Sequence, residues 1–372
     1  MSKIALIVPG GVDPSGSQRV IPALLWLIKR LAVHHDLHVF ALRQPEGPPR
    51  YELLGATVHD LGAGRSRVRS LARSLRILYG EHERAPFALL HALWAVPPGF
   101  IAAVAGKLFR VPVLLHLAGG ELVALHDVRY GGRRTLRGRL QVWTALRGAA
   151  RITAASAPMQ AAAACLGYPA QRMPLGVDIE EWPARAPRPR DPESPARLLY
   201  IASLNRVKDP STLLRAAARL AEEGVRFNLD VVGTDTLAGE TQRAAETLGL
   251  SERVRFHGVL THDRLRPLVE RADLLLVSSR HEAGPVVALE AAVAGVPTVG
   301  TAVGHVAEWA PEAAVAVPIG DDRALAAEIA GLLADDSRRL RIAAAAQARA
   351  LECDADWTAG QVLRNYAELL AS

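Results

Sequence analysis

Two glutamates, Glu282 and Glu290, stand where the sequence predicts a ligand, with seven residues between them. Residues 274–278 form a short apolar run typical of a buried strand, 285–294 favour a helix that begins at a proline, and 297–302 favour the next strand. In such a unit, ligands bind beyond the carboxyl end of the strand, where the first helical turn offers free N–H groups to an anion. The sequence therefore predicts an anion site beside two carboxylates, which accept hydrogen bonds strongly from hydroxyl groups.

A second segment brings positive charge to the same kind of strand end. Residues 198–203 predict a strand, and Arg206 and Lys208 follow it, directly before a helix that Asp209 can cap at Pro210. A cation fixed at this position stabilises the negative charge that develops on a phosphate leaving group. An anion site, hydroxyl-binding carboxylates and a fixed cation together indicate a nucleotide sugar.

The amino-terminal half begins with a glycine-rich turn between a predicted strand at residues 4–8 and a predicted helix at 18–32. Gly16 in this turn is a candidate for close approach of the backbone to a ligand. The sequence lacks the lysine that a phosphate loop requires there, and it lacks the three-glycine dinucleotide pattern.

His91 and His116, each in or beside a predicted strand, are candidates to face the ligand. The alternative for both is a histidine with its hydrogen bonds made within the sheet. We expect four other histidines of this half to face solvent: His34, His35, His59 and His82.

Predicted strands and helices alternate through both halves, which favours two doubly wound, parallel α/β domains. A length of 372 residues also exceeds the usual size of one hydrophobic core. A segment rich in proline and arginine, with little apolar content, marks a linker between the halves. The predicted parts are a first domain at 1–182, a linker at 183–196, a second domain at 197–352 and a last helix at 353–372 that packs back on the first domain.

Composition limits the location and the partners. The net charge of +6 divides into +11 for residues 1–180 and −5 for residues 181–372. The basic half indicates either an anionic partner, such as a membrane leaflet or a lipid-linked phosphate, or a chain that simply prefers arginine. Nucleic acid is disfavoured. Two cysteines are too few for a disulfide framework, and we find no leader-like segment or membrane span, so we expect a cytoplasmic protein, peripheral on the inner face of the membrane if it binds lipid.

Two arginine-rich segments are candidates for such a surface. Residues 65–78 alternate arginines with apolar residues in a predicted amphipathic helix, and residues 129–139 follow a glycine-rich loop. A basic amphipathic helix can lie on an anionic membrane. The alternative is an ordinary surface helix with solvated arginines.

The motifs of the carboxyl-terminal half resemble the donor domain of retaining glycosyltransferase family 4. The resemblance is carried by the two glutamates in Glu282–Glu290, Gly295 and Pro297 after them, Lys208, and several flanking patterns: residues 175–178, 256–259 and 320–321. It extends over nearly the whole chain and implies a GT-B fold, in which two Rossmann-like domains face a central cleft. The first domain would then bind the acceptor and the second the donor.

The resemblance also implies roles for individual residues. Glu290 would bind the ribose hydroxyls, Glu282 the hydroxyls of the donor sugar, and Arg206 and Lys208 the diphosphate. Gly284, Val286 and Val287 belong to the phosphate cradle, and Val259 would present its backbone to the base. The leaving phosphate would take the proton of the acceptor on the same face, so that neither a metal nor a covalent nucleophile is required. UDP- or GDP-sugars are the expected co-substrates.

Three positions depart from the family pattern. Ser203 replaces an arginine that usually precedes the lysine by five residues, Gly284–Pro285 replaces an aromatic–glycine pair, and Ala118 stands where a histidine is common. Pro285 at the first helical position would remove one N–H from the cradle.

The predicted function is sugar transfer to a hydroxyl of a glycan, a lipid-linked sugar or a small molecule, as in glycolipid or cell-surface polysaccharide biosynthesis. The alternatives are a GT-B phosphorylase or epimerase, and a non-catalytic nucleotide-sugar-binding partner of a polysaccharide assembly system.

Overall fold

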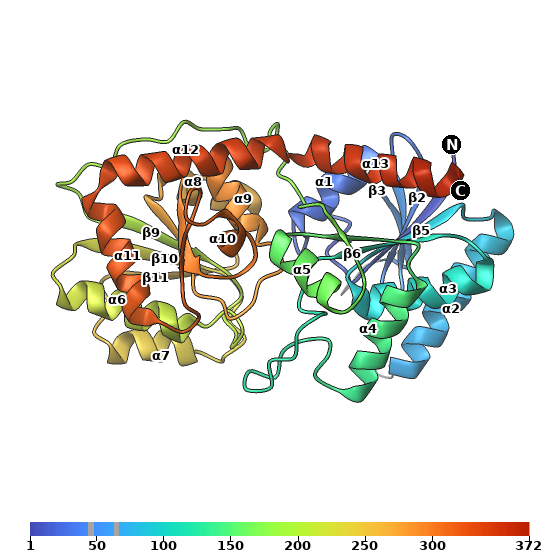
Figure 1. Ribbon diagram of the computed structural model, residues 1–372, viewed down its shortest axis with the longest axis horizontal. Helices are drawn as coiled ribbons and strands as arrows, with labels where there is room; N and C mark the ends of the chain where they lie inside the picture. Colours follow the sequence, from blue (N-terminus) through green and yellow to red (C-terminus); the bar gives the residue numbers. More distant parts are fainter. Residues whose placement is uncertain (44–47, 63–66, 372) are drawn as a thin grey trace. The chain divides into compact units, whose positions relative to one another are not determined.

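The computed structural model describes residues 1–43, 48–62 and 67–371, which divide into two compact units. Unit 1 comprises Met1–Gly176 and Ala355–Ser372, and unit 2 comprises Val177–Asp354. Each unit is a sheet between two layers of helices (Figure 1).

Unit 1 is built on an eight-stranded sheet in the order β3-β4-β2-β1-β5-β6-β7-β8. All neighbouring strands are parallel except β3 and β4, which form an antiparallel edge that the sequence analysis missed. The strands are β1 (Lys3–Val8), β2 (Asp36–Ala41), β3 (Arg50–Leu53), β4 (Ala56–Asp60), β5 (Leu89–Leu93), β6 (Val113–Leu117), β7 (Arg151–Ala154) and β8 (Gln171–Arg172). The central strands β1, β5 and β6 are buried along nearly their whole length, as expected for a parallel sheet covered on both faces.

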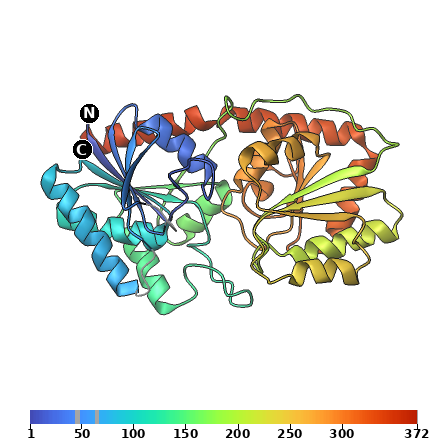
Figure 2. The same ribbon diagram turned by 180° about the vertical axis from the view of Figure 1, so that it is seen from behind.

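The helices of unit 1 are α1 (Pro22–Leu31), α2 (Arg67–Arg84), α3 (Phe100–Phe109), α4 (Leu136–Gly148), α5 (Ala157–Cys165) and α13 (Ala355–Ala371). Helix α13, at the far end of the chain, packs against α1 on one face of the sheet, which both views show, while α2, α3 and α4 pack together on the other (Figures 1 and 2). Arg30 of α1 and Asp356 of α13 form an ion pair of 2.7 Å. The helix predicted from residue 18 begins only at Pro22, because the glycine-rich turn extends through residues 14–19.

Unit 2 carries a six-stranded, all-parallel sheet in the order β11-β10-β9-β12-β13-β14. Its strands are β9 (Ala196–Ile201), β10 (Phe227–Val232), β11 (Val254–Gly258), β12 (Leu274–Val277), β13 (Thr298–Thr301) and β14 (Val315–Val317). Its helices are α6 (Pro210–Glu222), α7 (Glu240–Thr247), α8 (His262–Arg271), α9 (Val286–Val293), α10 (Gly304–Trp309), α11 (Asp322–Ala334) and α12 (Asp336–Glu352). Helices α6, α7 and α11 cover one face, and α8, α9 and α12 cover the other (Figure 1).

The strand order of unit 2 indicates which edge of its sheet can bind a ligand. Strand β9 lies at the centre, with β10 on one side and β12 on the other. The strand order therefore reverses beside β9, which is where open α/β sheets bind ligands beyond the carboxyl ends of their strands. The loops that leave β9 and β12 carry Lys208 and Glu282, respectively.

Residues 183–196 pack on unit 2. The Arg188 guanidinium donates to the carbonyl oxygen of Ala272 at 3.1 Å, and Arg339 donates to the carbonyl oxygen of Arg188 at 2.8 Å. Arg339 is only 2% exposed, so a buried side chain of unit 2 anchors residues 183–196 to that unit. Among the described residues, no helix has the length and apolar content that crossing a bilayer requires.

Candidate active site

The loop after β9 holds the backbone of Lys208 in place. The Asn205 side-chain oxygen accepts from the N–H groups of Val207 and Lys208 at 3.1 and 3.0 Å. The hydroxyls of Tyr200 and Ser278 both donate to the Lys208 carbonyl oxygen at 2.9 Å. Because Tyr200 belongs to β9 and Ser278 follows β12, Lys208 is fixed from two neighbouring strands.

Asp209 connects this loop to α6. Its backbone is left-handed, with φ 48° and ψ 59°, a conformation that costs free energy for a residue other than glycine. Its carboxylate accepts from the Thr212 N–H at 3.2 Å and from the Ser211 hydroxyl at 2.6 Å, which caps the helix. The cap and the Ser278 hydroxyl, which also donates to the Asp209 carbonyl, hold the strained turn.

The loop after β12 brings Glu282 against Lys208. The Lys208 Nζ lies 2.5 Å from Glu282 Oε1, and the Ser279 hydroxyl donates to the same oxygen at 2.6 Å. The side chains of Lys208 and Glu282 are 26% and 12% exposed. The predicted cation and one predicted carboxylate therefore meet at the carboxyl edge of the sheet, partly open to solvent.

Helix α9 begins at Val286, with Pro285 as the residue before it. The prediction that Pro285 occupies the first helical position is therefore wrong by one residue, but proline still contributes no N–H to this end of the helix. Val286 and Val287 open the helix and are half-buried, as is Gly284 in the loop. The first N–H groups of a helix have no partner within it, so this end can bind an anion.

Gly304 supports the same loop from the start of α10. Its φ is +49°, and a Cβ there would lie 2.8 Å from the Pro285 ring and 3.1 Å from the Glu282 Cβ. A larger residue would displace the turn that carries Glu282. The sequence pattern gives no sign of this role for Gly304, because the close approach depends on the packing of α10 against the preceding loop.

Glu290 lies in the buried part of α9, 3% exposed. His262 Nε2 is 3.0 Å from Glu290 Oε1, and Trp182 Nε1 donates to the Glu290 carbonyl oxygen at 2.9 Å. The Trp182 and His262 rings lie 4.6 Å apart between centroids. The sequence did not identify His262; the available signal was its place at the start of a helix, three residues after Val259, which is 72% exposed.

Arg206 is directed away from this group. Its guanidinium lies 3.5 Å from Glu240 of α7, and both side chains are mostly exposed. The structure therefore does not bring Arg206 to the Lys208–Glu282 pair, contrary to the prediction that it shares the diphosphate. Position in the loop could not reveal this, because successive side chains of a turn point in different directions.

The two histidines predicted to face a ligand are internal to unit 1. His91 Nδ1 lies 2.8 Å from the Tyr366 hydroxyl of α13, and His116 Nδ1 lies 2.9 Å from Thr153 Oγ1. Both histidines are 0% exposed, and burial lowers the pKa of His91 to about 3 and that of His116 to about 4. This contradicts their placement as substrate contacts; the alternative, histidines held within the sheet, describes them.

A buried carboxyl ties together two strand-end loops of unit 1. Glu121 Oε1 accepts from the N–H of Ala118, after β6, at 3.0 Å and from that of Ala95, after β5, at 3.4 Å. Burial raises the pKa of this carboxyl.

Gly16 lies in the turn after β1, with φ +65° and its N–H donating to the Asp13 carbonyl at 2.9 Å.

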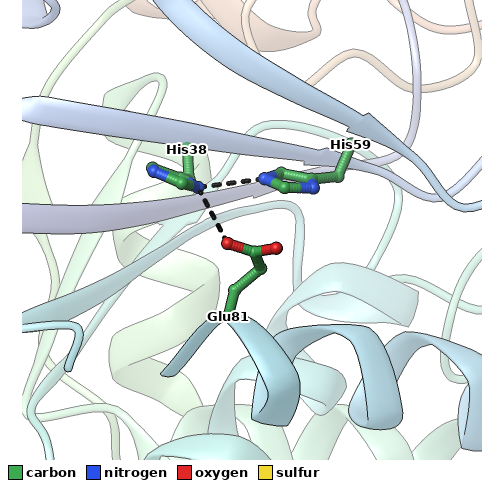
Figure 3. Close-up of side chains that lie close together, drawn as sticks. All are labelled: His38, His59 and Glu81. Carbon is green, nitrogen blue, oxygen red and sulfur yellow. Dashed lines mark hydrogen bonds and ion pairs between the residues drawn. The ribbon is translucent and has the colours of Figure 1, made fainter. Parts of the chain in front are cut away.

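A histidine pair and a glutamate form a buried group in unit 1 (Figure 3). His38 Nδ1 lies 2.9 Å from His59 Nε2 and 3.9 Å from Glu81 Oε2. The prediction that His59 faces solvent is wrong, since it is 4% exposed and stacked on Phe40. Arg84 pairs with the same carboxylate at 2.5 Å. This positive charge offsets the attraction for a metal ion, so we describe the group as a hydrogen-bond network.

Both halves match families of known function. Residues 183–349 match the family described as glycosyl transferases group 1, and residues 20–176 match the glycosyl transferase 4-like domain. The chain belongs to the GT-B glycosyltransferases. The predicted fold, two doubly wound α/β units of the GT-B class, is confirmed.

Individual relatives agree with this family. A glycogen synthase of Mycobacterium tuberculosis is 34% identical over 184 residues, which are 49% of this chain and 44% of that protein. The match thus spans less than half of the relative. A sucrose-phosphate synthase of Thermosynechococcus elongatus has the same fold, with a TM-score of 0.82 at 21% identity and 100% coverage of both chains. The Anabaena protein HepE in complex with UDP-glucose gives a TM-score of 0.75 at 20% identity, covering 99% of this chain and 100% of the other.

Proposed function

We propose that this protein is a retaining, metal-independent glycosyltransferase that moves a sugar from a nucleoside-diphosphate sugar to a hydroxyl acceptor. The observation that carries the proposal is the Lys208–Glu282 pair at the carboxyl edge of the unit 2 sheet, 2.5 Å between Nζ and Oε1. A cation and a carboxylate held side by side match the two parts of the donor, because phosphate requires the first and sugar hydroxyls the second.

Lys208 and the start of α9 would hold the diphosphate. As the bond from the sugar C1 to the phosphate oxygen breaks, negative charge grows on that oxygen, and a fixed ammonium with oriented N–H groups stabilises it. The acceptor oxygen forms the new bond to C1 on the same face, and its proton passes to the departing phosphate oxygen. Charge compensation by residues of the chain is the reason for proposing a metal-independent reaction.

Glu282, Glu290 and Val259 would orient the rest of the donor. Glu282 accepts from sugar hydroxyls, and Glu290, with His262 beside it, accepts from ribose hydroxyls. The exposed Val259 presents backbone groups to the base. A UDP-sugar is favoured over a GDP-sugar by the fold shared with HepE, whose structure holds UDP-glucose.

The charge of unit 1 supports an anionic acceptor or surface. We propose an acceptor such as a lipid-linked sugar or a glycan at the inner face of the membrane, in the biosynthesis of a glycolipid or polysaccharide. The Arg-rich composition of residues 1–180, with a net charge of +11, is the basis of this part.

Isothermal titration with UDP, GDP and ADP tests the donor site. We expect one nucleotide to bind, and Glu290→Ala to abolish transfer of sugar from the matching nucleotide sugar. Glu252→Ala, which alters an exposed glutamate of unit 2, serves as the matched control and should retain activity. Failure of all three nucleotides to bind, or full activity of Glu290→Ala, would overturn the proposal.

Product analysis separates the alternatives. Transfer yields a glycosylated acceptor and a nucleoside diphosphate, whereas a phosphorylase yields sugar phosphate and an epimerase changes only the sugar. A non-catalytic binding partner would bind the nucleotide and release no product.

A further inference from the structure

Helix α4 has a second apolar face, which is exposed. Its inward face packs Gly138, Val142, Ala145 and Leu146 into unit 1. Its outward face carries large apolar side chains spaced by four and three residues, so they lie on one side of the helix. These are Leu136, Leu140 and Trp143, which are 82%, 60% and 50% exposed.

Arginines surround this apolar face. Residues 128–177 contain eight arginines and no aspartate or glutamate. Arg137 and Arg139 are exposed on α4, and the Arg147 guanidinium lies 5.6 Å from the centre of the Trp143 ring. Within the described part of the chain, none of these three arginines forms an ion pair. Their charge is therefore available to an external anion.

A groove beside Trp143 adds a place for an anionic headgroup. It lies between α3 and α4, which pack side by side (Figure 1), and has a volume of about 610 Å³. Lys107, Arg110 and Arg147 line it, together with Trp143, and no carboxylate belongs to its lining. Three cations around one groove without a carboxylate favour a phosphate group.

We propose that the α4 face, defined as Leu136, Leu140, Trp143 and the surrounding basic side chains, docks on an anionic phospholipid bilayer. The apolar stripe would enter the boundary between headgroups and acyl chains, with Trp143 at the interface. The arginines would contact lipid phosphates, and the groove would hold one headgroup. The inference deepens the membrane part of the proposed function by naming its surface.

The structure favours α4 over α2, which contains most of the basic amphipathic helix predicted at residues 65–78. In α2, Leu78 is buried and Leu71 and Leu75 are half-buried, so its apolar face packs inward against the unit. Arg73 and Arg76 are exposed and solvated, as in an ordinary surface helix. Arg65, which belongs to the predicted segment, lies outside the described residues.

Co-sedimentation of the full chain with vesicles tests the docking surface. We expect binding to vesicles of phosphatidylcholine with phosphatidylglycerol and none to phosphatidylcholine alone. Leu140→Ser/Trp143→Ser should reduce partition at least tenfold. Replacing Arg137 or Arg147 by alanine should reduce it by about fivefold each, the usual effect of one basic residue near an anionic surface. Trp143 is the exposed tryptophan of the chain, so binding should also shift its fluorescence to shorter wavelength.

Matched controls separate docking from folding and from catalysis. Val33→Ser changes an exposed apolar residue of unit 1, and Arg341→Ala an exposed arginine of unit 2; both should bind as the parent does. Circular dichroism checks that the α4 variants fold, and UDP titration tests the donor site independently of lipid. Equal binding of parent and Leu140→Ser/Trp143→Ser, or absence of binding to anionic vesicles, would overturn the proposal. So would a dimer in sedimentation velocity that the double variant dissolves, since a second copy would then be the occupant.

Discussion

Replacing Glu282 by glutamine should tighten the binding of a nucleoside diphosphate while reducing sugar transfer. In the structure Lys208 is paired with Glu282, so a diphosphate that binds at Lys208 must compete for the ammonium group. Glutamine keeps the size of the side chain and its hydrogen bond to Ser279 but removes the negative charge. The change therefore separates the electrostatic role of Glu282 from its shape.

The size of the effect follows from the exposure of the pair. With side chains 26% and 12% exposed, the pair is partly screened, and an exposed ion pair contributes about 1 kcal/mol or less. Releasing Lys208 should then lower the dissociation constant of UDP by up to about fivefold. Lys208→Ala should raise the same constant by about 10- to 100-fold, because a hydrogen bond to a charged group contributes about 1.5–3 kcal/mol.

Isothermal titration of both variants with UDP, followed by transfer assays with the intact nucleotide sugar, measures these effects. Arg206→Ala is the control, since its side chain is exposed and pairs with Glu240; it should change UDP affinity by less than about twofold. If Glu282→Gln weakened UDP as strongly as Lys208→Ala, the carboxylate would be part of the phosphate site's scaffold, and the reasoning from competition would fail.

Two further predictions concern the scaffold. Gly304→Ala should lower the free energy of unfolding by about 1–3 kcal/mol in chemical denaturation and weaken UDP binding, because the methyl group would meet Pro285 at 2.8 Å in a left-handed backbone. Gly331→Ala in helix α11 is the control, because a Cβ there would come no closer than 3.7 Å to the Arg338 side chain. It should leave both quantities unchanged or stabilise the fold slightly. Unit 1 should lose stability as the pH falls from about 6.5 toward 4, since burial lowers the pKa of His59 and of His116 to about 4 and the unfolded chain then binds more protons. Hydrogen exchange of unit 1 peptides measures this loss of stability, which is on the order of 3 kcal/mol per histidine. His59→Gln should make the stability of unit 1 depend less on pH, whereas His34→Gln, at an exposed position, should not. An equal pH dependence in the parent and in His59→Gln would contradict the role given to His59.

The sequence was most informative where a motif coincides with a strand end. Lys208 and Glu282 follow β9 and β12, and since the carboxyl ends of neighbouring parallel strands share one edge, their meeting could be expected. The periodicity of apolar residues likewise predicted two parallel α/β sheets, but not the antiparallel edge that β3 and β4 form in unit 1. The start of α9 was displaced by one residue, because proline is acceptable both before a helix and at its first position.

The sequence pattern did not predict the direction in which individual side chains point. His91 and His116 lie in strands, where a shift of one residue moves a side chain to the other face of the sheet. Their partners, Tyr366 and Thr153, are 275 and 37 residues away in sequence and could not be inferred from local spacing. The exposed face of α4 was hidden for the same reason, since only the packed structure shows which of its two apolar faces is inward.

The pairing of Lys208 with Glu282 explains how one site can hold a carboxylate beside an anion. Before the donor binds, each charge has the other as its partner, and Ser279 supports the carboxylate. In the proposed function, phosphate would replace Glu282 at the ammonium group and sugar hydroxyls would replace Lys208 at the carboxylate when the donor enters, so that no polar group would lose a partner. A nucleoside diphosphate without its sugar satisfies only the first exchange and leaves Glu282 facing a phosphate. The intact donor should therefore bind more tightly than its nucleotide product, which would favour product release after transfer.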